Sequence, residues 1–206
     1  GLGSLLSKFV KGWVYDYFIS IELTIAAVGG ISVLSLFLAN IYLKHYLVLM
    51  YVEIVLIGLL VGLEIPLLTR LLAERNKGSL KDNLAHIFTF DYLGGLVGAV
   101  AFPLCLLPKL GYFSTAFLCG LLNAIAAIVV LRAYKRKIKR PRLLQGLACS
   151  LLVLMVGGLC FSQGISQFIE QGLYRDAVIF SQQTPYQKLV MTRHKDDLRL
   201  FIDGSL

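Results

Sequence analysis

The sequence predicts an all-α polytopic membrane bundle of about five transmembrane helices, followed by a short amphipathic helix and a β-hairpin that begins a soluble domain. Composition is the first reason for this class. Hydrophobic residues make up 57% of the chain and charged residues only 16%, and the mean hydropathy is +0.76, whereas charged residues are about a quarter of a soluble globular domain. The second reason is that apolar runs of about twenty residues recur, and a helix of that length crosses the roughly 30 Å hydrocarbon core.

The apolar runs place the transmembrane domain at residues 1–163. Lipid offers the backbone no hydrogen-bond partners, so each run is expected to be a helix and the runs to pack as a bundle. The first residues resemble the end of an earlier apolar segment, so we expect more chain upstream. The expected spans lie at about 17–39, 47–68, 88–108, 113–131 and 143–161.

Four carboxylates fall inside these spans and are the intramembrane polar candidates: Glu22, Glu53, Glu64 and Asp91. An ionised carboxylate facing lipid costs several kcal/mol, so each is expected to point into the bundle. At 100° per residue, Glu53 and Glu64 lie within about 20° of each other on one face of the second span. Such a stripe fits a pathway for cations, and equally a pair of packing residues satisfied by hydroxyl groups.

The third span carries a face of small residues beside its acid. Gly94, Gly95 and Gly98 fall within about 60° of Asp91 on a helical wheel. Small residues let helix backbones approach closely. We therefore expect this face to pack against another helix. Gly29 shares a face with Glu22 in the first span, and that face is expected to be packed as well.

Basic residues are distributed unequally between the two sides of the predicted bundle. Thirteen Lys and Arg lie before the first span and in the second-to-third and fourth-to-fifth loops, against Lys44 and Lys109 on the opposite side. The positive-inside rule then places the basic loops in the cytoplasm and the C-terminal hairpin on the opposite side. The chain is expected to be an integral protein of the bacterial inner membrane, with the lipid bilayer as its partner and no nucleic acid bound.

The cysteines give no sign of a metal centre. Cys105, Cys119, Cys149 and Cys160 are scattered through apolar segments without metal-ligand or disulfide-framework spacing. We expect neither a metal site nor a disulfide framework.

The pattern changes after Gln163. Residues 164–176 place apolar side chains at helical spacing, which predicts a short amphipathic linker helix on the membrane surface. Residues 177–206 are strand-like, because AVIFSQ is rich in β-branched and aromatic residues and KLVMTR and DLRLFI alternate. The last two segments predict a hairpin with one apolar face. Its area is too small for independent stability, so it is expected to open a larger domain.

Two groups of motifs resemble one known family. The segments TPYQKLVMTR at 184–193 and DLRLFIDGSL at 197–206 are similar to the N-terminal sheet of spermidine synthases, the polyamine aminopropyltransferases. The segments GLEIPLLTRLL at 62–72 and FDYLGGLVGAVAFPLCLLPKLG at 90–111 resemble the membrane domain fused ahead of that enzyme in many bacterial relatives. The resemblance covers essentially the whole chain.

The resemblance implies an enzyme activity for the intact protein. Members of the spermidine synthase family transfer an aminopropyl group from decarboxylated S-adenosylmethionine, a co-substrate, to an amine such as putrescine. In the family, the Gln at the position of Gln187 contacts the nucleoside donor or its product. On its own residues, Gln187 would be a polar side chain on the outer face of an edge strand. The family's nucleotide loop, ribose-binding acid and proton-accepting Asp lie downstream, so we assign no catalytic residue to this chain.

Two other classes of function remain. A transporter-like bundle for cationic amines would have the four intramembrane acids lining one cavity. An accessory subunit of a larger membrane complex, or a homo-oligomer, would instead make extensive apolar contacts along a small-residue face such as that of Gly94, Gly95 and Gly98.

Overall fold

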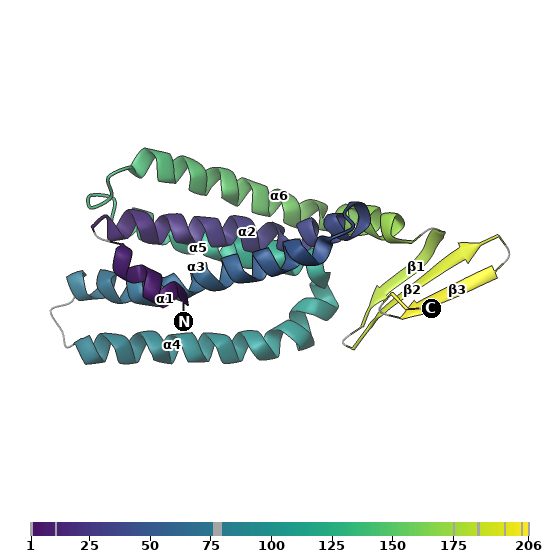
Figure 1. The fold of residues 1–206 in the computed structure, drawn as a ribbon, viewed down its shortest axis with the longest axis horizontal. Helices are drawn as coiled ribbons and strands as arrows, with labels where there is room; N and C mark the ends of the chain where they lie inside the picture. Colours follow the sequence, from purple (N-terminus) through teal and green to yellow (C-terminus); the bar gives the residue numbers. More distant parts are fainter. Residues whose placement is uncertain are drawn as a thin grey trace.

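The computed structural model describes residues 2–10, 12–75, 80–174, 176–184, 186–195, 197–202 and 204–205. These residues form a bundle of long helices with an antiparallel sheet at one end (Figure 1). The helical elements are α1 (Leu2–Leu6), the 3-10 helix η1 (Ser7–Phe9), α2 (Val14–Tyr42), α3 (Tyr46–Arg75), α4 (Leu80–Ala101), the π-helix η2 (Phe102–Leu106), α5 (Leu107–Ala133) and α6 (Pro141–Leu173). The strands are β1 (Ala177–Gln183), β2 (Lys188–His194) and β3 (Asp197–Ile202).

The long helices lie side by side and give the bundle two distinct ends (Figure 1). The start of α2, the end of α3 and the α5–α6 loop lie at the left in Figure 1. We call this the basic end, because the loop carries most of the Lys and Arg side chains of residues 132–142. The sheet lies beyond the right-hand end, the sheet end. The α5–α6 loop and the C-terminal strands therefore lie at opposite ends of the molecule.

Four helical segments among the described residues are long and apolar enough to cross a membrane, judged by length and composition: Val14–Tyr42, Tyr46–Glu74, Leu84–Ala133 and Pro141–Leu173. The third holds both of the spans expected at 88–108 and 113–131. The connection between the spans expected at 47–68 and 88–108 is shorter than expected, because α3 continues to Arg75 and α4 begins at Leu80. Residues 76–79 lie outside the described residues.

The chain reverses direction between α4 and α5 with only a short interruption of the helical backbone. Pro103 has no backbone N–H to donate to the preceding turn, and the helix widens into the π-helix η2 at this point. Gly111 then adopts φ 76, a left-handed conformation that glycine tolerates without steric cost. Figure 1 shows α4 and α5 as two arms joined at the sheet end. The third span was expected to end at Pro108, but the reversal uses η2 and Gly111 instead.

A close helix crossing joins α2, α5 and α6. A Cβ added at Gly120 would lie 2.8 Å from the Ala26 carbonyl oxygen and 2.9 Å from the Gly30 Cα. Met155 of α6 is fully buried at the same point. Because no side chain fits between α2 and α5 here, glycine on both helices permits the close approach.

The small-residue face of α4 is not packed in this way. A Cβ at Gly94, Gly95 or Gly98 would meet nothing within 4 Å, and Asp91 is exposed. A Cβ added at Gly29 of α2 would likewise meet nothing within 4 Å. No helix among the described residues therefore packs closely on the face of Gly94, Gly95 and Gly98, whereas Glu22, on the same face of α2 as Gly29, is buried. Small residues permit close packing but do not specify a partner, and Figure 1 shows α4 set apart from the other helices.

The expected amphipathic linker helix at 164–176 is the last part of α6. No proline interrupts the helix between Pro141 and Leu173, so the backbone continues without a break. Ile169 is fully buried in an apolar cluster that includes Ile41 of α2. This segment therefore packs on the end of α2 instead of lying apart on a surface.

The sheet has the order β1–β2–β3, with all neighbouring strands antiparallel. The predicted hairpin is confirmed as β2 and β3, with Met191 opposite Leu200 in register. Strand β1 extends the hairpin to a third strand. Val190 and Thr192 of β2 are fully buried on one face, whereas the apolar residues of β3 remain exposed on the other: Leu198, Leu200 and Ile202.

Candidate functional site

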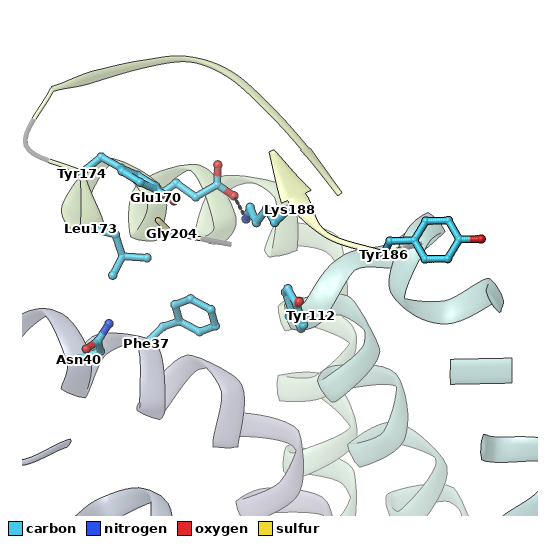
Figure 2. A pocket seen from close by; sticks show the side chains of 9 residues that line it. All are labelled: Phe37, Asn40, Tyr112, Glu170, Leu173, Tyr174, Tyr186, Lys188 and Gly204. Carbon is cyan, nitrogen blue, oxygen red and sulfur yellow. Dashed lines mark hydrogen bonds and ion pairs between the residues drawn. The ribbon is translucent and has the colours of Figure 1, made fainter. Parts of the chain in front are cut away.

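A cavity of about 640 Å³ lies where the helix ends meet the sheet, and we call it the junction cavity (Figure 2). The last turns of α2 and α6, the start of α5 and the β1–β2 turn supply its wall. Aromatic rings and one ion pair dominate the wall. Its lining residues are Phe37, Asn40, Tyr112, Glu170, Leu173, Tyr174, Tyr186, Lys188 and Gly204.

The ion pair of the junction cavity links α6 to the sheet. Lys188, the first residue of β2, donates a hydrogen bond to Oε1 of Glu170, as the dashed line in Figure 2 marks. The Ser166 hydroxyl, one turn earlier on α6, donates to the same oxygen at 2.9 Å. The Glu170 side chain is 8% exposed and that of Lys188 21%. Water therefore screens this pair less than it would a surface pair.

Its surroundings favour the ionised form of Glu170. Burial raises the pKa of this carboxyl, while hydrogen bonds from Lys188 and Ser181 lower it. The lowering contributions dominate, so the pKa of Glu170 lies below its ordinary value. The ion pair of this carboxylate with Lys188 thus holds the sheet against α6.

A second charged cluster fixes the strands to one another. Asp176, just before β1, accepts a hydrogen bond from Arg199 of β3 at 3.0 Å. The Nδ1 atom of His194 lies 2.6 Å from the other Asp176 oxygen. These contacts join the beginning of β1 to β2 and β3, and we interpret them as structural.

Gln187, the predicted donor-binding residue, lies in the turn between β1 and β2. Its backbone N–H donates to the Thr184 hydroxyl at 3.0 Å, and that hydroxyl donates to the Gln187 carbonyl at 2.7 Å. The residue is exposed, and its neighbours Tyr186 and Lys188 line the junction cavity. The position is a fixed turn next to the cavity instead of the outer face of a strand. Asp203 of the same motif lies outside the described residues.

Three of the four intramembrane acids come together near the basic end. Glu22 of α2 is only 2% exposed, and its carboxyl is within hydrogen-bonding reach of Glu64 on α3. Asp91 of α4 lines a cavity with Glu64 and is close enough to act on its charge.

The fourth acid, Glu53, is separate. It accepts a short hydrogen bond from the Ser35 hydroxyl of α2 and lies toward the sheet end of α3. Glu53 and Glu64 both contact α2, which agrees with their predicted position on one stripe of α3. The four acids do not line a single cavity. Among the described residues, no group of three His, Cys, Asp or Glu side chains is arranged to hold a metal ion.

Sequence reasoning missed Glu170 and Lys188. Glu170 was one of two acids, with Asp176, in the segment interpreted as an amphipathic linker. A buried acid among apolar residues at helical spacing is itself a signal of a specific partner. Lys188 gave no such signal, because an ionic side chain at the start of a strand is usually solvated.

Comparison with known proteins bears on the whole chain. The chain matches no family model, and no solved structure gives a significant match to it. It is 34% identical to the polyamine aminopropyltransferase of Leptospira interrogans over 206 residues, 37% to polyamine aminopropyltransferase 2 of Ralstonia nicotianae over 213 residues and 37% to the Mycobacterium tuberculosis enzyme over 215 residues.

Each match covers 100% of this chain and 41% of the relative. The chain therefore spans about two fifths of the length of these relatives. The similarity runs through the helices as well as the strands and agrees with the resemblance of the 184–193 and 197–206 segments to spermidine synthases. Over its whole length, the chain is therefore homologous to part of the curated polyamine aminopropyltransferases.

Proposed function

We propose that the chain is the membrane anchor and first sheet of an aminopropyltransferase. The complete enzyme transfers an aminopropyl group from decarboxylated S-adenosylmethionine to putrescine or a related amine. The observation that carries the proposal is that the similarity to polyamine aminopropyltransferases extends over the entire chain, helices included. In this proposal, the helices are part of the enzyme, as the strands are.

The reaction sets requirements that the remainder of the enzyme fulfils. The amine nitrogen attacks the carbon next to the sulfonium, a C–N bond forms, and the C–S bond breaks with its electron pair going to sulfur. The products are methylthioadenosine and a secondary ammonium, which loses a proton. Alignment of the two reactants and a neutral attacking amine are therefore the main needs.

The described residues support such a role through the junction cavity. The Glu170–Lys188 pair fastens the sheet to α6, and Gln187 lies in the adjoining turn with its backbone held by Thr184. An amide side chain both donates and accepts hydrogen bonds, which suits recognition of a nucleoside. In this proposal, Gln187 binds the donor.

Membrane anchoring rests on the four long apolar helical segments. The basic end is placed in the cytoplasm by the positive-inside rule, and the sheet on the opposite side. Trp13 and the clustered basic residues of the α5–α6 loop would then lie at the headgroup level. In the structure, the Lys139 ammonium lies 3.6 Å from the Trp13 ring centroid, and the Lys139 and Arg140 N–H groups donate to Asp16 at 3.2 Å.

The proposal is tested with the complete protein purified in lipid nanodiscs. Decarboxylated S-adenosylmethionine is supplied with a panel of diamines and polyamines, and methylthioadenosine and the extended amine are quantified by mass spectrometry. We expect equimolar formation of both products with at least one amine. A folded, complete protein that forms neither product with any amine of the panel would exclude the transferase and favour an accessory-subunit role.

A further inference from the structure

A cavity of about 360 Å³ lies at the basic end, between the first turns of α2 and those of α6, and we call it the α2–α6 cavity. Both helices begin at this end and run toward the sheet end (Figure 1). Trp13 directly precedes α2 and Arg140 directly precedes α6, and both side chains line the cavity. Residues further along the two helices therefore line its deeper part.

The wall of the α2–α6 cavity changes from charged to apolar with depth. Arg140 lies before the first residue of α6, whereas Leu143 and Leu147 follow that residue and also line the cavity. At 1.5 Å per residue, Leu147 lies about 9 Å along the helix from its start. Leu143 and Leu147 are one turn apart and share a face of α6. They are 55% and 51% exposed, so they form an apolar strip that the described residues leave uncovered.

The charged part of the cavity carries cations without acidic partners. Among the residues that the structure describes, no carboxylate forms an ion pair with Lys139 or Arg140. Asp16 of the wall is 8% exposed, and it accepts hydrogen bonds at 3.2 Å from the backbone N–H groups of Lys139 and Arg140. Asp16 therefore fixes the backbone of the loop, and the two cationic side chains remain available to an external anion.

Trp13 places these cations beside the cavity. Its ring centroid lies 3.6 Å from the Lys139 ammonium and 5.9 Å from the Arg140 guanidinium carbon. Trp13 adopts φ 49, a left-handed conformation that is unfavourable for a bulky residue. Such strain persists only where surrounding contacts determine the backbone. The two cation contacts are of this kind, so the ring and both charges are held together at one side of the cavity.

This combination of features selects the class of ligand. A free phosphate would use the cations but leave the strip of Leu143 and Leu147 uncovered. A zwitterionic lipid would bring its own positive charge next to Arg140. An anionic glycerophospholipid fits both parts, because its phosphate accepts hydrogen bonds from a guanidinium group while its acyl chain covers the leucines.

We propose that the α2–α6 cavity is a specific site for an anionic glycerophospholipid. Its phosphate lies at Arg140 and Lys139, and one acyl chain lies along Leu143 and Leu147. The site goes beyond aminopropyl transfer and rests only on the membrane anchoring in the proposed function. It does not depend on the side of the membrane that the basic end faces. A protein that stays in washed membranes without preferring the anionic lipid would overturn the site and leave the proposed function intact.

Binding is measured by native mass spectrometry of the complete protein in a neutral detergent. The probes are dimyristoyl phosphatidylglycerol and dimyristoyl phosphatidylcholine, which carry the same acyl chains. We expect the wild type to bind the first phosphatidylglycerol about tenfold more tightly than phosphatidylcholine, and Arg140→Gln to lose about that factor. Arg136→Gln makes the same charge change in the same loop outside the cavity wall and should bind as the wild type does.

Three results of this titration would overturn the proposal. They are equal binding of both lipids by the wild type, wild-type affinity in Arg140→Gln, and equal weakening in Arg140→Gln and Arg136→Gln. Inorganic phosphate distinguishes a lipid site from a free-anion site. Phosphate in large excess should leave phosphatidylglycerol bound, and displacement of the lipid by phosphate at the lipid's own concentration would contradict the site.

A measurement on the wild type covers a folding failure of Arg140→Gln. Phosphatidylglycerol with a photoreactive diazirine near the start of one acyl chain is crosslinked to the complete protein in nanodiscs, and labelled peptides are identified by mass spectrometry. Excess phosphatidylglycerol should reduce labelling of residues 143–147, whereas excess phosphatidylcholine should not. Leu96 of α4 is 64% exposed and serves as the internal control, because both lipids should compete equally there. Equal competition at residues 143–147, or no labelling of them, would contradict the site.

Discussion

Lys188 of β2 donates a hydrogen bond to the Glu170 carboxylate of α6, and both side chains face the junction cavity. This pair joins the two parts of the chain that the sequence distinguishes, the apolar helices and the strands. Tyr174 adds an aromatic contact from the end of α6 to Phe201 of β3, with ring centroids 4.9 Å apart. The sheet is therefore mounted on the bundle by specific contacts.

Removing the lysine should release the sheet from α6. Lys188→Met leaves the buried Glu170 carboxylate without its counter-charge, and we expect a loss of about 2–3 kcal/mol in the free energy of unfolding. The double variant Glu170→Gln with Lys188→Met should recover part of that loss, because no charge remains buried. Thermal unfolding midpoints, together with proteolysis at the α6–β1 link, measure both effects. Equal stability of the wild type and Lys188→Met would show that the pair contributes nothing.

The same contact predicts a dependence on acid. The pKa of Glu170 lies below its ordinary value of 4.5, since hydrogen bonds from Lys188 and Ser181 outweigh the effect of burial. A lowered pKa in the folded state means that this stability is present above pH 4.5 and is lost as the pH falls through the lowered pKa. Proteolysis of the α6–β1 link should accelerate over that range. Glu170→Gln should lack this acceleration, and an identical pH profile in the variant would contradict the assignment.

Gly120 should resist any enlargement. Gly120→Ala places a methyl group 2.8 Å from the Ala26 carbonyl oxygen, so α2 and α5 must separate, and we expect a destabilisation of about 1–3 kcal/mol. Gly146→Ala in α6 is the control, because nothing lies within 4 Å of its added Cβ. That substitution should be neutral or stabilising by up to about 1 kcal/mol through helix propensity. Thermal unfolding of both variants in nanodiscs distinguishes them.

Gln187 is expected to affect donor binding in the complete enzyme. Gln187→Ala should raise the KM for decarboxylated S-adenosylmethionine about tenfold, since a hydrogen bond to a ligand is worth about 1 kcal/mol or more. Gln182→Ala, an exposed glutamine of β1, serves as the control and should leave KM unchanged. A normal KM in Gln187→Ala would return this residue to a structural role in the turn.

The proposed orientation in the membrane places the two ends of the bundle on opposite sides. In a protein with its native cysteines replaced, Gln182→Cys should react with a membrane-impermeant maleimide from the outer side of the inner membrane. Lys135→Cys in the α5–α6 loop should react only after permeabilisation. The reverse pattern would place the sheet in the cytoplasm, where the aminopropyl donor is made.

Most of the helical part could be predicted because it depends on local properties. Apolar runs of sufficient length locate α2, α3, α5 and α6, and the alternation of residues 188–202 locates the β2–β3 hairpin. The continuation of α6 to Leu173 was missed because amphipathic spacing was taken as a sign of a separate surface helix. In fact Ile169 packs on α2, and this contact is non-local.

Contacts between distant segments account for the rest. The stripe of Glu53 and Glu64 follows from helical geometry, but the sequence does not specify that one faces Ser35 and the other Glu22. The openness of α4 beside Gly94 and Gly98 was also unpredictable, since a small-residue face allows a close neighbour without requiring one. The Glu170–Lys188 pair depends on how the chain folds back through β1.

In the proposed function, the helices and the sheet belong to one membrane-anchored aminopropyltransferase. Its most direct test is methylthioadenosine formation from decarboxylated S-adenosylmethionine and putrescine or a related amine by carbonate-washed membranes that contain the complete protein. Activity should stay with the washed membranes and be absent from membranes lacking the protein. Intact, folded protein in the membranes without any product, or activity released entirely by the wash, would contradict it.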